Sequence, residues 1–184
     1  MRVPAAELEP HPRSPCEPVR RICVDIGFEA GPGVLRLRYR IEGDMGRLRL
    51  PATEFARRRD GLWQHTCFEA FLRTDASESY HEFNFAPSGD WAAYRFGGRR
   101  SDRSAPDLPA PILRFHAGQD RCELSADISM PALPELAAAG SIDAGMAAVV
   151  ETNDGGLSFW ALSHGGGTPD FHDPATFRLQ VTTR

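Results

Sequence analysis

The sequence predicts an all-β protein: an antiparallel β-sandwich with a jelly-roll-like, immunoglobulin-like arrangement of two sheets and one or two short helices. Apolar and polar residues alternate over about eleven short segments, as expected when successive side chains of a strand point to opposite faces. Turns rich in glycine, proline and aspartate separate these segments, which is typical of sandwiches and barrels. The sequence holds no long amphipathic helical pattern and no internal repeat.

Length and composition fit one domain spanning residues 1–184. The 184 residues are 41% hydrophobic and carry a formal net charge of -4, and a chain of this length can bury a core of its own. There is no basic footprint, so nucleic acid is not an expected partner. The N-terminal residues are too polar for a signal peptide, and no segment is apolar enough to span a membrane. We therefore expect a cytoplasmic protein without membrane contact.

The N-terminal part predicts an edge strand and then a hairpin. Residues 3–8 form the candidate edge strand, after which four prolines between positions 10 and 18 exclude regular pairing. Residues 19–28 and 34–41 alternate on either side of a Gly-Pro-Gly turn, which indicates two antiparallel strands. Residues 53–60 form a candidate helical turn, with Thr53 as its cap.

The block 62–96 is expected to hold three consecutive antiparallel strands, at 62–72, 80–85 and 91–96. Polar connections of hairpin length join them. The C-terminal part predicts further strands at 112–116, 122–128, 147–151, 157–162 and 177–181, with a hairpin turn in the Asn-Asp-Gly-Gly sequence that precedes Leu157 and a short helix at 133–139.

The central strands should present one polar and aromatic face. In the first two strands the apolar parity places Phe68, Phe83 and Phe85 in the core, and in the third strand the apolar parity is the even one. If each apolar set faces inward, the opposite face gathers the side chains with functional chemistry. These are Trp63, His65, Glu69, Tyr80, Glu82, Asn84, Trp91 and Arg95.

Four motifs give the chain a family resemblance. LWQHTCFEAFL, YHEFNFAPSGDWAAYRF, SFWALSH and PDFH, in this order and spacing, resemble the bacterial DOMON-like proteins, a group within the superfamily of DOMON domains and family 9 carbohydrate-binding modules. The resemblance covers nearly the whole chain. It implies a jelly-roll-like sandwich whose concave face or rim takes sugars in the carbohydrate-binding relatives and haem in other DOMON proteins, and it brings no established activity for this group.

Some individual residues match the family pattern, and others depart from it. Glu69 looks like the acidic residue of one superfamily strand, and the pattern from Tyr80 to Asn84 looks like the Y-x-E-x-N of the next. Arg99 and Phe159 stand where the family pattern has tyrosines. Any ligand contact made by those two tyrosine hydroxyls is therefore not carried over to this chain.

The residue types on the predicted face fit sugar recognition. A sugar needs a flat aromatic ring against its apolar side and polar groups for its hydroxyls. The sequence therefore predicts a small polar ligand, a saccharide or sugar-containing metabolite, with loops carrying Trp160, His164 and His172 closing the site. The structural alternative is that the tryptophans plug the ends of the sandwich and that Glu82 and Arg95 form a cross-strand ion pair.

Four further alternatives are considered. The chain could be a protein-interaction module without a small-molecule ligand, with a homodimer as one form. It could be a glycosidase-like enzyme that uses Glu69 and Glu82, about 5 Å apart on neighbouring strands, as an acid and base, although we expect binding rather than catalysis. A divalent metal could use His65, Glu69, Glu82, His164 and His172 only if the loops fold over the sheet. Haem binding in the relatives uses methionine and histidine ligands, and this sequence has no methionine in a matching motif. We therefore expect no cofactor.

Overall fold

The computed structural model describes residues 5–51, 55–75 and 77–183. These residues form eleven strands in one hydrogen-bonded sheet and one short α-helix, α1 (Pro134–Ala138). The strands are β1 (Ala6–Pro10), β2 (Val19–Glu29), β3 (Val34–Gly43), β4 (Cys67–Arg73), β5 (Tyr80–Phe85), β6 (Trp91–Phe96), β7 (Ile112–Ala117), β8 (Arg121–Ser129), β9 (Ser141–Glu151), β10 (Leu157–Ala161) and β11 (Phe177–Thr182).

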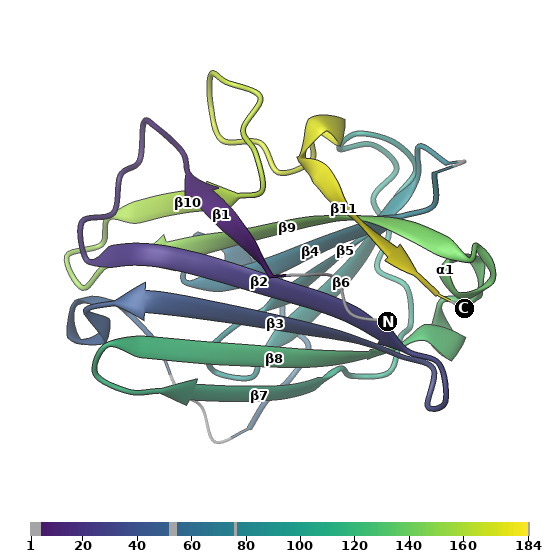
Figure 1. Cartoon of the computed structure of the whole chain (residues 1–184), viewed down its shortest axis with the longest axis horizontal. Helices are drawn as coiled ribbons and strands as arrows, with labels where there is room; N and C mark the ends of the chain where they lie inside the picture. The colour runs from purple at the N-terminus through teal and green to yellow at the C-terminus, as the bar shows by residue number, and fades with distance from the viewer. Residues whose placement is uncertain (1–4, 52–54, 76, 184) are drawn as a thin grey trace.

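The strands pair in the order β6-β5-β4-β9-β10-β1-β2-β3-β8-β7, with β11 added beside β9, and every pairing between named strands is antiparallel. The sheet curls over, so that β2, β3, β8 and β7 lie in front of β9, β4, β5 and β6 (Figure 1). Strand β1 joins the two halves, because Leu8 pairs with Ile22 of β2 and Glu9 pairs with Ala161 of β10. The predicted all-β antiparallel class is thus confirmed.

The main core fills the space between the two halves. Leu35, Leu37 and Ile41 of β3 are fully buried in one cluster with Phe68 of β4 and Phe85 of β5. This arrangement follows from alternation, since one parity of each strand is apolar and its burial removes that surface from water. The predicted inward direction of Phe68, Phe83 and Phe85 is confirmed.

A buried tyrosine hydroxyl also makes a hydrogen bond within this core. The Tyr39 hydroxyl donates a hydrogen bond of 2.7 Å to the backbone carbonyl of Glu69, linking β3 to β4. We expect Tyr39→Phe to lower the free energy of unfolding by about 1 kcal/mol, the usual net value of a buried hydrogen bond. Chemical denaturation monitored by circular dichroism measures this difference, and an unchanged denaturation midpoint would contradict it.

Several outer elements follow the sequence, but the strand predicted at an edge is wrong in that respect, because β1 pairs with both β2 and β10. The hairpins β2–β3 and β9–β10 form as predicted, and α1 lies within the predicted helix at 133–139. Of the candidate helical turn at 53–60, residues 53 and 54 lie outside the described residues, and 55–60 are not helical. Among the residues described here, no helix combines the length and apolar character needed to cross a membrane.

The central block differs from the prediction in two places. The first strand begins at Cys67, not at residue 62, because Gly61 adopts a left-handed φ of 77° and starts a short 3₁₀ helix, Leu62–Gln64. The predicted phase of β6 is wrong. Trp91 packs in the main core, whereas Tyr94 pairs with Glu82 on the opposite face. Nearly all of β6 is buried on both faces, so apolar parity alone could not identify the core side.

Candidate functional site

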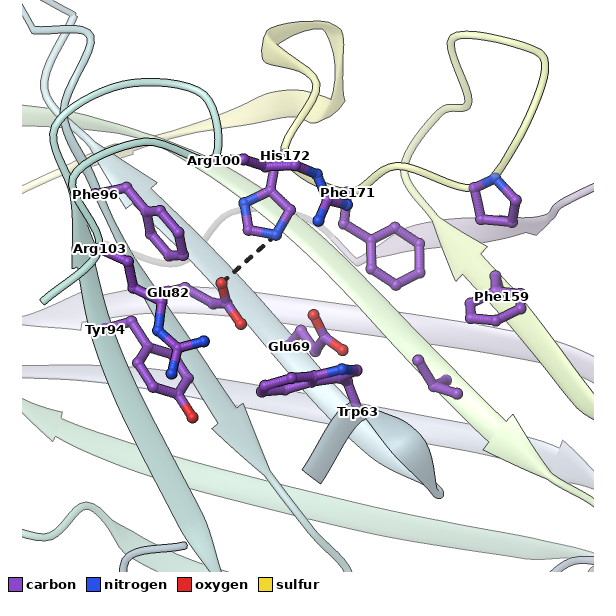
Figure 2. Close-up of a pocket in the computed structure, with 12 residues that line it drawn as sticks. Trp63, Glu69, Glu82, Tyr94, Phe96, Arg100, Arg103, Phe159, Phe171 and His172 are labelled. Carbon is purple, nitrogen blue, oxygen red and sulfur yellow. Dashed lines mark ion pairs between the residues drawn. The ribbon is translucent and has the colours of Figure 1, made fainter. Parts of the chain in front are cut away.

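A cavity of about 320 Å³ opens over the face of β4, β5 and β6 that points away from the main core. Figure 2 shows carboxylates at its floor, aromatic rings around them and two guanidinium groups beside them. A volume of this size lies at the lower end of the range for small-molecule sites. Its lining residues are Trp63, Glu69, Glu82, Tyr94, Phe96, Arg100, Arg103, Val149, Phe159, Pro169, Phe171 and His172.

The aromatic wall is built by three separate parts of the chain. Trp63 comes from the 3₁₀ helix, is 37% exposed, and meets the ring of Tyr94 edge-on at 6.2 Å between centroids. Phe159 of β10 and Phe171 of the following loop pack together at 6.2 Å. The cavity therefore offers an indole and several rings to the apolar face of a guest.

Glu69 is the least satisfied polar group at the site. It is 4% exposed, and its Oε1 atom has no hydrogen-bond partner among the described residues. Burial raises its pKa well above the usual value, the nearby charge of Glu82 raises it further, and Arg100 opposes the shift. A buried carboxyl without a donor is costly in its ionised form, so Glu69 favours its protonated form and can then both donate and accept hydrogen bonds.

Glu82 has partners that Glu69 lacks. The Asn84 side-chain amide donates a hydrogen bond of 2.7 Å to Glu82 Oε1. Burial raises the pKa of Glu82, while the Asn84 bond and the charges of Arg103 and Arg100 pull it down. Of the two carboxyls, Glu82 is therefore the better supported as an anion.

The sheet register also corrects the expected geometry of this pair. Glu69 lies opposite Asn84, and Glu82 lies opposite Phe71. The two glutamates are thus diagonal neighbours, for which Cα atoms lie about 7–8 Å apart, rather than the directly opposed pair assumed for a separation of about 5 Å.

His172 closes one side of the cavity. Its Nδ1 atom lies 2.6 Å from the Tyr80 hydroxyl, and its Nε2 atom lies 3.7 Å from Glu82 Oε2. Burial, with the charge of Arg100, lowers the His172 pKa to about 4, so the ring is neutral at pH 7. The Tyr80 oxygen accepts a hydrogen bond of 3.2 Å from the backbone amide of Arg100, and its hydroxyl can donate to Nδ1 in the tautomer that carries the ring proton on Nε2, toward Glu82.

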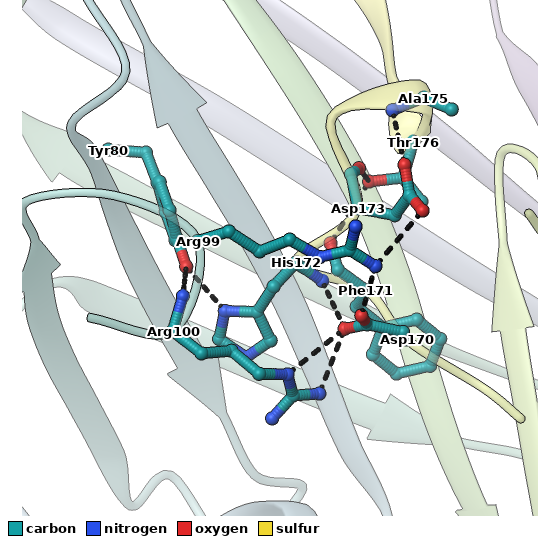
Figure 3. A network of polar contacts seen from close by, with 9 residues as sticks. All are labelled: Tyr80, Arg99, Arg100, Asp170, Phe171, His172, Asp173, Ala175 and Thr176. Atoms are coloured by element: carbon teal, nitrogen blue, oxygen red, sulfur yellow. Dashed lines mark hydrogen bonds and ion pairs between the residues drawn. The ribbon is translucent and has the colours of Figure 1, made fainter.

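Two arginines from the loop after β6 complete the wall. The Arg103 guanidinium stacks over the ring of Tyr94, with its central carbon 4.4 Å from the ring centroid. Arg100 is held by two contacts to Asp170 Oδ1, at 2.9 and 3.2 Å (Figure 3). Carboxyl, guanidinium, imidazole and aromatic groups thus converge on one cavity that can bind a neutral, polyhydroxylated ring.

Six of the eleven predicted site residues lie at this cavity or directly behind it. Trp63, Glu69, Glu82 and His172 line it. Tyr80 and Asn84 do not line it, but each holds a lining residue through a hydrogen bond.

The other five predicted site residues lie elsewhere. His65 contacts Glu151 at 2.8 Å and lines a different cavity, and His164 contacts the backbone carbonyl of Glu9 at 2.9 Å. Trp91 and Trp160 are 7% and 4% exposed and belong to the main core. Arg95 is exposed on the opposite parity of β6 and contacts Ser79, so the ion pair with Glu82 considered above does not form.

The predicted site lacks the two arginines and most of the aromatic wall. The apolar parity of β6 predicts Tyr94 and Phe96 in the main core, whereas the structure places both at the cavity. Phe171 lies in the PDFH motif beside His172, so the motif itself was a usable signal. Arg100 and Arg103 lie in a glycine- and arginine-rich loop, where nothing in the pattern distinguishes a pocket residue from a solvated one.

The residues that the structure describes contain no group of three or more histidine, cysteine, aspartate or glutamate side chains placed to hold a metal ion. Glu69, Glu82 and His172 line the same cavity.

The sequence matches no protein-family model and no curated protein sequence. Solved structures do show a similar fold. One is a candidate carbohydrate-binding protein from Bacteroides uniformis, with a TM-score of 0.73 and 16% identity over 98% of this chain and 86% of that one.

Two further structures are of a family 9 carbohydrate-binding module from Caldicellulosiruptor kristjanssonii. The complex with cellotriose has a TM-score of 0.52 and 12% identity, covering 88% of this chain and 74% of that one. The complex with glucose has the same score and identity, covering 95% and 83%. At such low identity the likeness concerns architecture, and we conclude that this chain shares the fold of proteins described as carbohydrate-binding.

Proposed function

We propose that this protein binds a saccharide in the cavity over β4, β5 and β6. The observation that carries the proposal is the buried Glu69 carboxyl, whose Oε1 lacks a partner among the described residues and which lines a cavity walled by aromatic rings. A sugar supplies what this arrangement lacks: a hydroxyl for Glu69 and Glu82, and an apolar ring face for Trp63 or Tyr94.

The fold adds support. The similar module from Caldicellulosiruptor kristjanssonii binds cellotriose and glucose, which makes glucose and short β-glucans the first ligands to test. Membership of the DOMON-like group, a jelly-roll-like sandwich and a cytoplasmic location remain parts of this proposal. A reducing compartment would be consistent with the free thiols of Cys16, Cys23, Cys67 and Cys122.

The tryptophans offer a direct test. Trp63 is the half-exposed indole at the cavity, while Trp91 and Trp160 are buried in the main core. Titration with glucose, cellotriose and a panel of other neutral mono- and oligosaccharides should change the tryptophan fluorescence of the unmodified protein. Trp63→Phe should abolish this change.

Trp91→Phe and Trp160→Phe serve as controls, and both should retain the response if they stay folded. Calorimetric titration of the same panel checks binding without a fluorescent reporter. If no sugar of a broad panel binds by either method, the proposal fails.

A further inference from the structure

Two loops meet at one side of the cavity, and an ion-pair network joins them. The loop after β6 supplies Arg99, Arg100 and Arg103, and the loop before β11 supplies Phe171, His172 and Asp170. Figure 3 shows Asp170 at the centre of this network, with the two guanidinium groups directed at it. The network lies at the wall of the cavity and not on its floor.

Asp170 makes four polar contacts. Its Oδ2 accepts from Arg99 at 2.6 Å, and its Oδ1 accepts from Arg100 at 2.9 and 3.2 Å and from the backbone amide of His172 at 3.1 Å. It is not a lining residue of the cavity, but Arg100 and His172 are. Asp170 therefore reaches a bound molecule only through its neighbours.

The arginine loop needs such an anchor. Arg100 and Asp102 have left-handed φ values of 54° and 51°, a region that costs energy for residues other than glycine. The backbone amide of Arg100 is held by the Tyr80 hydroxyl at 3.2 Å, and its side chain is held by Asp170. Without the carboxylate, one of these two restraints is lost.

We propose that Asp170 is a positioning residue of the saccharide site: its ion pairs set Arg100 and His172 in the cavity wall, so that the affinity for an uncharged sugar depends on a charged contact outside the cavity. This inference rests on the proposed function. The ion pairs are partly exposed, with side-chain exposures of 51%, 58% and 23% for Arg99, Arg100 and Asp170. Each is therefore weak alone and sensitive to salt, while several together can hold a loop.

The decisive variant is Asp170→Asn, and the chain offers a matched control. Asp143 is 22% exposed, forms one ion pair of 3.5 Å with Arg73 and lies away from the cavity. In calorimetric titrations with glucose and cellotriose, Asp170→Asn should raise Kd about 3- to 10-fold, as expected for loss of a small ion-pair network. Asp143→Asn should leave Kd unchanged.

A second test varies the salt concentration. Raising sodium chloride from about 0.1 to about 1 M shortens the screening length from about 10 to about 3 Å. The Kd of the unmodified protein for the uncharged sugar should rise, and the Kd of Asp170→Asn should not. Equal salt dependence in the two proteins would overturn the proposal.

The His172 ring gives a readout that needs no ligand. Its pKa is lowered to about 4, chiefly by burial, and Asp170 acts in the raising direction. If Asp170→Asn removed only a charge, the pKa of His172 would fall further. If the variant also loosens the cavity wall, water reaches the His172 ring and its pKa rises toward the ordinary value of about 6.5. Nuclear magnetic resonance titration of His172 should show the rise.

These results separate the two proposals. A fall or no change in the His172 pKa, or equal loss of affinity in Asp170→Asn and Asp143→Asn, overturns the positioning role. If neither glucose nor cellotriose binds the unmodified protein, the sugar proposal loses its first ligands, and the His172 titration still decides whether Asp170 positions the wall. Thermal unfolding midpoints of both variants show that each is folded.

Discussion

Replacing Glu82 with glutamine should weaken saccharide binding about 10- to 100-fold, the value of a hydrogen bond to a charged group. Glutamine keeps the oxygen that accepts from Asn84 Nδ2 at 2.7 Å. It places an amide donor where Oε2 faces His172 Nε2 at 3.7 Å, and it removes the negative charge opposite Arg103. The side-chain shape is preserved, so the loss would report chemistry rather than packing.

Calorimetry with the tightest-binding sugar of the panel measures the effect. Glu151→Gln is the matched control, because Glu151 and Glu82 are both 5% exposed while Glu151 lies outside the cavity, paired with Arg49 and His65. The control should bind the sugar normally. Wild-type affinity in Glu82→Gln would show that the sugar does not use this carboxylate.

The second large effect concerns pH and Glu69. Its folded-state pKa is raised by burial and by Glu82, while the unfolded chain ionises near about 4.3. Below that pH both states are protonated and the group costs nothing. As the pH rises, Glu69 ionises first in the unfolded state, so the free energy of unfolding falls by at most about 1.4 kcal/mol per pH unit. The fall ends once the pH exceeds the folded-state pKa.

We therefore expect Glu69→Gln to remove this pH-dependent loss of folding stability. The free energy of unfolding of the variant should exceed that of the unmodified protein by about 1–3 kcal/mol at pH 8 and by much less at pH 5. Urea denaturation at both pH values measures the difference. Subtracting the two curves cancels the opposite contribution of His172, whose lowered pKa favours the folded state as the pH rises. Parallel curves for the two proteins would contradict the assignment of Glu69 as a protonated group.

The sequence predicts strands well where one face is apolar and the other polar. The β2–β3 hairpin has this pattern: β3 alternates strictly between buried and half-buried residues. Its parity, together with the intervening turn, was enough to place both strands and their core side.

Prediction failed where both faces are buried. In β6 only Arg95 is exposed, so the tyrosine and phenylalanine of one parity and the tryptophan of the other are equally compatible with a core. The register with β5, which sets Tyr94 opposite Glu82, decides the phase. Register depends on pairing between strands and cannot be read from a single strand.

The candidate site could likewise be predicted from the sequence only in part. Glu69 and Glu82 were identified together because strand alternation is local. The convergence of Arg100 and His172, which are 72 positions apart in the numbering, depends on two loops that ion pairs join in space. The cations of the cavity are therefore Arg100 and Arg103 of this loop, and Arg95 of β6 is not among them.

Strand parity in β4 and β5 has an evolutionary consequence. Phe68, Ala70, Phe83 and Phe85 point into the main core, whereas the residues between them point to the other side. Selection can therefore act on recognition at alternate positions while the intervening positions go on maintaining the architecture. Substitutions at every second position of these strands would change the chemistry of the cavity face and leave the core-facing side chains as they are.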